Sequence, residues 1–83
     1  MPASPGLIGS EAAMEGTLRN HIKLERARRN LTQEQLADLA GVTRKTINTI
    51  ETGRFVPSTI LALTLARVLG VRVEDLFELD TIG

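Results

Sequence analysis

The sequence predicts a small all-α domain of five helices. From residue 17 onward, apolar residues recur at helical spacing, and each such stretch lies between residues that start and stop helices. Cysteine is absent from the 83 residues and the only aromatic residues are two phenylalanines, which excludes a disulfide framework and disfavours modules that stack the bases of single strands. A chain of this length buries only about 60% of its unfolded surface, so its stability requires dense helix packing or a partner subunit.

The stretch from Thr32 to Gly41 predicts the second helix. Thr32 and Gln35 form the pattern of a capping box, in which each side chain satisfies a free backbone N–H of the other residue. Gly41 ends the helix, because glycine adopts the left-handed backbone conformation at little steric cost. Ala37 is small, as is needed where two helices cross steeply after a short turn.

The third helix is expected directly after this turn. Thr43 can cap its first turn, Ile47 and Ile50 form its buried face, and Gly53 ends it. Positions 44 and 48 lie one turn apart, as do positions 45 and 49. The side chains at these four positions therefore share one exposed surface.

Three further helices are expected around this pair. Their predicted bounds are Thr17 or Leu18 to Arg29 for the first helix, Thr59 to Leu69 for the fourth and Val73 to Phe77 for the fifth. Asn30 can end the first helix in the left-handed conformation, while Ser58 can cap the fourth helix and Gly70 can end it. The remaining residues, 78–83, are too few for a second domain.

The ordered caps, stops and apolar positions resemble those of the phage repressor and Cro-like family of helix-turn-helix transcription regulators. The matching residues are Gln33, Ala37, Gly41, Val42, Ile47, Ile50 and the ending Glu51-Thr52-Gly53. The resemblance covers about residues 18–77. It implies a compact five-helix, repressor-like DNA-binding domain and a sequence-specific transcriptional regulator. Such a regulator would bind double-stranded DNA as a homodimer, with its third helix in the major groove.

Two positions depart from the pattern of this family. Many relatives carry an apolar residue where this chain has Glu25, and the leucine lies one place earlier, at Leu24. We therefore expect the packing face of the first helix to differ. Arg72 stands where relatives usually have a serine cap, whose loss costs roughly 1 kcal/mol and is partly offset by Glu74 and Asp75 in the first turn.

The chain divides into a short leading segment and one domain. Residues 1–16 are rich in Pro, Gly, Ser and Ala and lack an apolar period, so we expect a flexible arm or a non-native extension. An arm that reaches into a DNA groove is disfavoured, because this segment contains no Lys or Arg. Residues 17–83 are expected to form the helix-turn-helix domain, with a C-terminal dimerisation region.

The charge of the chain is unevenly distributed, although its formal net charge is zero. Residues 19–54 contain eight basic and four acidic residues, whereas acidic residues outnumber basic ones on both sides of this range. The basic excess thus coincides with the helix-turn-helix, which is the electrostatic footprint expected of a protein that binds DNA.

The resemblance assigns DNA contacts to two sets of residues. The set expected to contact bases is Arg44, Lys45, Asn48 and Thr49, and the set expected to contact phosphates is Gln33, Thr43 and Arg54. Arginine can donate two hydrogen bonds to guanine, asparagine can pair with adenine and threonine can touch a thymine methyl group. A glutamine in the first turn of a helix lies where free N–H groups and the helix dipole attract phosphate. On composition alone, an ordinary solvated helix face would be the favoured interpretation of these polar residues, and the surrounding motif is what favours base contacts.

A structural ion pair is expected between the first and third helices. In repressors of the resembled family, an arginine of the first helix pairs with a glutamate near the end of the recognition helix. Arg26 and Glu51 match these two positions. Removing one partner of such a buried pair leaves the other charge without compensation.

The fourth helix is apolar on more than one side. Leu61, Leu65 and Leu69 belong to the stripe that closes the core, while other aliphatic residues fall on other faces. A partner subunit is the expected cover, and scattered exposed aliphatic residues are the alternative. The residues expected at a dimer interface are Ile60, Leu63, Val68, Leu79 and Ile82.

Other functions stay open on the sequence alone. Antitoxins of toxin–antitoxin pairs also use this domain, and a protein–protein adaptor could keep the fold without binding DNA. An enzyme is not expected, because the sequence has no glycine-rich phosphate loop, no Ser/His/Asp set and a single histidine, His21. No cofactor, metal or small-molecule effector is expected. The absence of a secretory signal and of roughly 18 consecutive apolar residues makes a cytoplasmic location the expectation.

Overall fold

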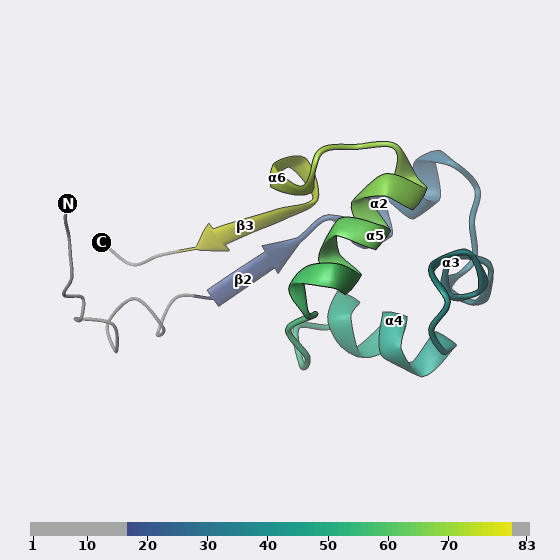
Figure 1. Cartoon of the computed structure of the whole chain (residues 1–83), viewed down its shortest axis with the longest axis horizontal. Coiled ribbons are helices and arrows are strands. Elements are labelled where there is room, and N and C mark those ends of the chain that lie inside the picture. Colours follow the sequence, from purple (N-terminus) through teal and green to yellow (C-terminus); the bar gives the residue numbers. More distant parts are fainter. Residues whose placement is uncertain (1–16, 81–83) are drawn as a thin grey trace, which may run out of the picture.

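The computed structural model describes residues 17–80 of the chain (Figure 1). Their elements are, in order, β2 (Thr17–Asn20), α2 (Ile22–Arg28), α3 (Gln33–Ala40), α4 (Arg44–Glu51), α5 (Thr59–Leu69), α6 (Val73–Leu76) and β3 (Phe77–Asp80). The two strands lie side by side at one end of the molecule, and α3 lies at the other end (Figure 1). No helix within these residues has the length and hydrophobicity needed to cross a membrane.

The expectation of an all-α fold is corrected by a two-stranded antiparallel sheet. Residues 17–20 form β2 instead of the first turn of a helix, and α2 begins only at Ile22. At the other end of the domain, the fifth helix ends at Leu76, and Phe77 begins β3 rather than closing the helix.

Pairing between distant segments explains why the first helix starts late. β2 pairs with β3 in a register that runs from Thr17 opposite Asp80 to Asn20 opposite Phe77. The Asn20 side chain then accepts a hydrogen bond from the N–H of Ile22 at 3.2 Å, which satisfies a free donor at the start of α2. Because strand formation here depends on a partner from the other end of the domain, local helical spacing gives no sign of it.

A side-chain contact links β3 to the residue before α2. Nε2 of His21 lies 3.0 Å from Oε2 of Glu78, and the His21 backbone N–H donates to the Leu76 carbonyl at 2.9 Å. The hydrogen bond with His21 lowers the pKa of the Glu78 carboxyl group below its ordinary value. Both side chains remain partly in solvent, so the side-chain contact adds little to stability.

The core is aliphatic and is shared by all five helices. Its buried residues are Ile22, Leu36, Ala37, Ile47, Ile50, Leu65, Ala66, Leu69 and Leu76. α5 lies between the other helices (Figure 1) and supplies three of these residues. Full burial of a leucine or isoleucine side chain contributes about 1.5–3 kcal/mol relative to exposure. This burial therefore holds α3 and α4 in place against α5.

The predicted helix ends of the central region are confirmed. Thr32 and Gln35 form a complete capping box at the start of α3. Thr43 and Ser58 cap α4 and α5, each accepting a hydrogen bond from the backbone N–H three residues further on. The residues in the left-handed conformation at or just after helix ends are Asn30, Gly41, Gly53 and Gly70, with φ of 55°, 76°, 79° and 71°.

The packing face of α2 differs from an all-apolar face at Glu25. This carboxylate is buried, and it accepts hydrogen bonds from Nη1 of Arg29 at 2.8 Å and from Nη1 of Arg28 at 3.3 Å. Leu24 is instead exposed. Two arginines on the following turn thus provide the compensation that a buried carboxylate requires.

Replacing Gly41 with alanine is expected to lower the free energy of unfolding by about 1–2 kcal/mol, because an L side chain strains the left-handed backbone. A Cβ atom at this position would meet no other atom within 4 Å, so the loss is conformational rather than steric. Urea unfolding measures this loss. Gly41→Asn is the matched control, since asparagine tolerates this conformation, and it should lose less. Equal losses in the two variants would contradict this account.

Candidate nucleic-acid interface

α3 and α4 form a helix-turn-helix whose short turn is fixed by backbone hydrogen bonds. α3 ends at Gly41, and the N–H of Val42 donates to the Ala37 carbonyl at 3.0 Å. Val42 is half-buried and packs against the core. The Thr43 hydroxyl then accepts from the N–H of Thr46 at 3.2 Å. α4 is therefore anchored to the end of α3 from its first turn.

The outer face of α4 carries the residues expected to contact bases. Arg44, Lys45 and Asn48 are exposed, whereas Ile47 on the opposite face is fully buried. Thr49 is half-buried, and its hydroxyl donates to the carbonyl of Thr46 at 2.9 Å. The four side chains thus lie at the surface of a helix whose other face is fixed in the core.

Ion pairs divide the basic residues of the domain into two groups. Among residues 17–80, the arginines that form ion pairs with acidic residues are Arg26, Arg28, Arg29 and Arg72. The basic residues of the same range that form none are all exposed, and they are Arg19, Lys23, Arg44, Lys45, Arg54 and Arg67. Arg44, Lys45 and Arg54 lie on or directly after α4, whereas the others are single residues on β2, α2 and α5. The uncompensated positive charge is therefore most concentrated at α4.

The residues expected to contact phosphates differ in the hydrogen bonds that their side chains already make within the protein. Gln33 is half-buried, and its Nε2 donates to Oε1 of Glu51 at 3.1 Å, so one of its two amide N–H groups is already engaged. The Thr43 hydroxyl caps α4 and lies 3.1 Å from the hydroxyl of Thr46. Arg54 is exposed beyond the end of α4, and its backbone N–H donates to the Thr49 carbonyl at 2.9 Å.

Glu51 joins three helices through a buried hydrogen-bond network. Nε of Arg26 donates to its Oε2 at 2.7 Å, and Nη2 of Arg26 donates to its Oε1 at 3.2 Å. Nη1 of Arg26 also donates to the Leu31 carbonyl at 2.8 Å. The side chains of Arg26 and Glu51 are 15% and 6% exposed. Together with the bond from Gln33, this network connects α2, the start of α3 and the end of α4.

Asn20 is a structural residue of the interface that sequence reasoning missed. Its Nδ2 donates to the carbonyl of Ile50 at 3.0 Å and lies 3.5 Å from that of Glu51. These bonds add a side-chain partner to carbonyl groups at the carboxyl end of α4, where the Ile50 carbonyl also accepts from the Gly53 N–H. A single polar residue thirty positions before its partner gives no local signal of this role.

The residues expected at a dimer interface differ in how far their side chains are exposed. Ile60, Leu63 and Leu79 are exposed. Val68 is half-buried and packs against the core of its own domain. Ile82 lies outside the described residues. The exposed members on α5 share an open surface hollow with Thr64 and Arg67.

Replacing Glu51 with alanine is expected to lower the free energy of unfolding by about 3–5 kcal/mol, because Arg26 would be left buried without a partner. Chemical denaturation followed by circular dichroism measures this change. Glu34→Ala is the control, since Glu34 is an exposed acid on α3, and its removal should change stability by less than about 0.5 kcal/mol. Wild-type stability of the Glu51 variant would contradict the role of this network.

Comparison with known proteins places this geometry in a family. The family model described as helix-turn-helix matches residues 22–76, which span α2 to α6. A relative from Methanothermobacter thermautotrophicus, described as an HTH-type transcriptional regulator, is 49% identical over 67 residues, covering 80% of this chain and 97% of the relative. A regulator of the same description from Methanocaldococcus jannaschii is 48% identical over 60 residues, covering 72% and 91%.

A solved structure has the same arrangement of helices. It is the restriction-modification controller protein C.AhdI from Aeromonas hydrophila, with a TM-score of 0.64 and 29% sequence identity. The match covers 66% of this chain and 83% of the controller protein. These matches agree in the helix-turn-helix and in the helices that support it. The chain belongs to the helix-turn-helix family of DNA-binding transcriptional regulators.

Proposed function

We propose that the protein binds a two-fold symmetric DNA site as a homodimer and inserts α4 of each subunit into the major groove. The observation that carries this proposal is the location of uncompensated Arg44 and Lys45 beside Asn48 on the exposed face of a helix anchored by Ile47 and Ile50. A helix with this division of faces can enter the groove without loss of core packing.

The side chains of α4 suit direct contacts with base edges. Arg44 can donate two hydrogen bonds to O6 and N7 of guanine, and Lys45 can reach a guanine or a phosphate. Asn48 can pair with N6 and N7 of adenine. The Thr49 hydroxyl already donates within the helix, so its methyl group is the part available to a thymine methyl. Sequence preference would therefore arise mainly from Arg44 and Asn48.

The phosphate contacts would lie on both sides of α4. Gln33 is held by Glu51 at the start of α3 and keeps a second amide N–H for a phosphate oxygen, close to the free backbone N–H groups of that helix. Thr43 at the start of α4 and Arg54 after its end would hold the flanking backbone. These contacts would set the depth and register of α4 without adding sequence preference.

Dimerisation would give the regulator its symmetric operator. Two recognition helices about 34 Å apart read half-sites one helical turn apart on the same side of the duplex. The exposed apolar residues available for this contact are Ile60 and Leu63 on α5 and Leu79 on β3.

Replacing Arg44 and Lys45 together with alanine is expected to weaken binding to duplex DNA by about a hundredfold or more, because each specific or phosphate contact contributes about 1–3 kcal/mol. The dependence of log affinity on log salt concentration should also become less steep, by about 0.9 for each phosphate that the variant no longer neutralises. Fluorescence anisotropy with a duplex that the wild type selects from a random pool measures both quantities.

The matched control for this experiment is Arg72→Ala. Arg72 is also an exposed arginine, but it precedes α6, which lies on the opposite side of the molecule from α4 (Figure 1). Its removal should leave both affinity and salt dependence nearly unchanged. If the double variant and the control bind alike, α4 is not the DNA-binding helix.

A further inference from the structure

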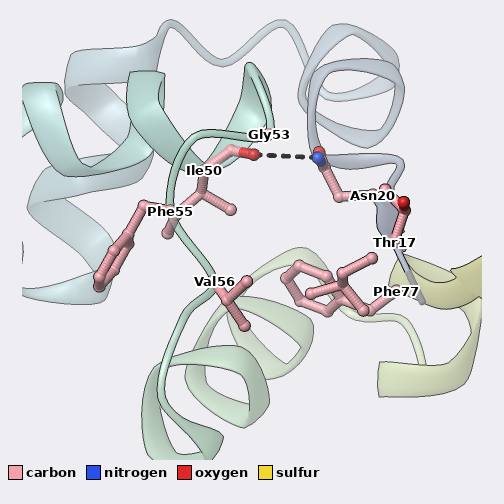
Figure 2. A pocket seen from close by; sticks show the side chains of 8 residues that line it. Thr17, Asn20, Ile50, Gly53, Phe55, Val56 and Phe77 are labelled. Atoms are coloured by element: carbon pink, nitrogen blue, oxygen red, sulfur yellow. Dashed lines mark hydrogen bonds between the residues drawn. The ribbon is translucent and has the colours of Figure 1, made fainter. Parts of the chain in front are cut away.

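A cavity of about 240 Å³ lies between the end of α4, the loop after it and the two strands. Its walls come from Ile50, Val56 and Phe77, with Asn20 and Thr17 at one side (Figure 2). The residues that form it are thus contributed by both ends of the domain and by the last turn of the recognition helix. Within the described part of the chain, no side chain fills this space.

The walls combine polar and apolar groups, and the apolar part suits the ring of a phenylalanine. Ile50, Val56 and Phe77 present only carbon atoms from their side chains. The amide of Asn20 is already engaged, because Nδ2 donates to the Ile50 carbonyl and Oδ1 accepts from the Ile22 N–H.

A bulky apolar side chain lies exposed at the edge of the same cavity. Phe55 is 48% exposed, and in Figure 2 its ring points away from Val56 and Phe77. Exposed phenylalanine is unfavourable in water unless a partner covers it. An exposed ring and a cavity with partly apolar walls therefore occur next to each other. This is the condition for a self-complementary contact about a two-fold axis, in which each copy fills the other.

We propose that the cavity receives Phe55 of a second copy of this chain, and that its own Phe55 enters the cavity of that copy. This inference rests on the homodimer of the proposed function and identifies the surface through which it forms. It centres the contact on the loop after α4 and the start of α5, with Phe77 at the start of β3 as one wall of the cavity.

Exposed apolar side chains continue along the chain after Phe55. Val56 is 67% exposed and Ile60 is 79% exposed, and Leu63 continues the same run one turn further along α5. At this exposure, the four side chains present on the order of 300–400 Å² of apolar surface per copy, the size of patch that often marks a binding site. Two copies would supply roughly 700 Å², which is most of the apolar share of a standard interface of about 1,600 Å².

The location of the cavity would couple dimerisation to DNA binding. Ile50 forms one wall and belongs to the last turn of α4, whose terminal carbonyls are held by Asn20. A partner ring packed against Ile50 would fix the orientation of α4 relative to the α4 of the other copy. Removing this ring should therefore weaken binding to a two-half-site duplex more than binding to a single half-site.

The test is Phe55→Glu, compared with Leu39→Glu, in sedimentation equilibrium of the full chain. Leu39 is also an exposed apolar residue, but it lies on α3, away from the cavity. We expect Phe55→Glu to raise the dimer dissociation constant at least tenfold while the Leu39 control dimerises like the wild type. Circular dichroism melts of each variant establish that it is folded.

A second measurement does not depend on any variant. In an equimolar mixture of isotopically labelled and unlabelled wild type, isotope-filtered NOE spectra should contain intermolecular contacts between the Phe55 ring and the methyl groups of Ile50 and Val56. A wild type that stays monomeric, a Phe55→Glu variant that dimerises normally, or equal dissociation caused by Leu39→Glu would each overturn the inference.

The proposed DNA-binding function has a separate readout. Anisotropy with a duplex selected by the wild type, and with the same duplex after one half-site is scrambled, reports half-site binding without dimerisation. Half-site binding equal for wild type and Phe55→Glu, with weaker binding of the variant to the intact duplex, supports the inference. If the wild type dimerises through Phe55 but binds neither duplex, the interface stands and the proposed function fails.

Discussion

The buried carboxylate of Glu51 is the interaction on which the geometry of the recognition helix depends. It is the last residue of α4, and it receives hydrogen bonds from Arg26 on α2 and from Gln33 at the start of α3. A buried charge of this kind is stable only with such partners, so the three helices cannot separate without a large loss of stability. Burial of Ile47 and Ile50 stabilises the packing of α4 against the core, but the hydrophobic effect does not favour one orientation of the helix over another. The network supplies the direction, and it also fixes the amide of Gln33 where a phosphate would approach.

The same principle of compensation determines where free positive charge remains. Arg28 and Arg29 neutralise the buried Glu25, and Arg26 neutralises Glu51, so these three arginines in and directly after α2 are used within the fold. Counting basic residues in the sequence therefore overestimates the positive electrostatic potential around α2. The same count is accurate around α4. The charge that would face DNA is that of Arg44, Lys45 and Arg54, and a chain with zero formal net charge can still attract a polyanion at one face.

The features that the sequence predicted well are those determined by neighbouring residues. The capping box of Thr32 and Gln35 and the left-handed Gly41 depend only on residues within one helical turn, and both occur as expected. The strand pair was missed because β2 and β3 stabilise each other from opposite ends of the domain. Residues 17–20 contain one apolar residue, Leu18, which fits either structure, and the pairing decides between them. Asn20 could not be assigned for the same reason, since its role exists only once α4 is beside it. The sequence shows that Val68 is an apolar residue. It does not show whether the core of the same domain or a partner subunit covers this side chain.

The strands do more than close the ends of the domain. Through Asn20 they hold the last carbonyl groups of α4, and through Phe77 they form a wall of the cavity that α4 also lines. α4 is therefore fixed at its start by the turn after α3, along one side by the core, and at its end by residues from β2. A helix constrained at both ends cannot adjust its tilt independently. In the proposed dimer, a contact made at the cavity would therefore act on the angle at which the exposed face of α4 meets a groove.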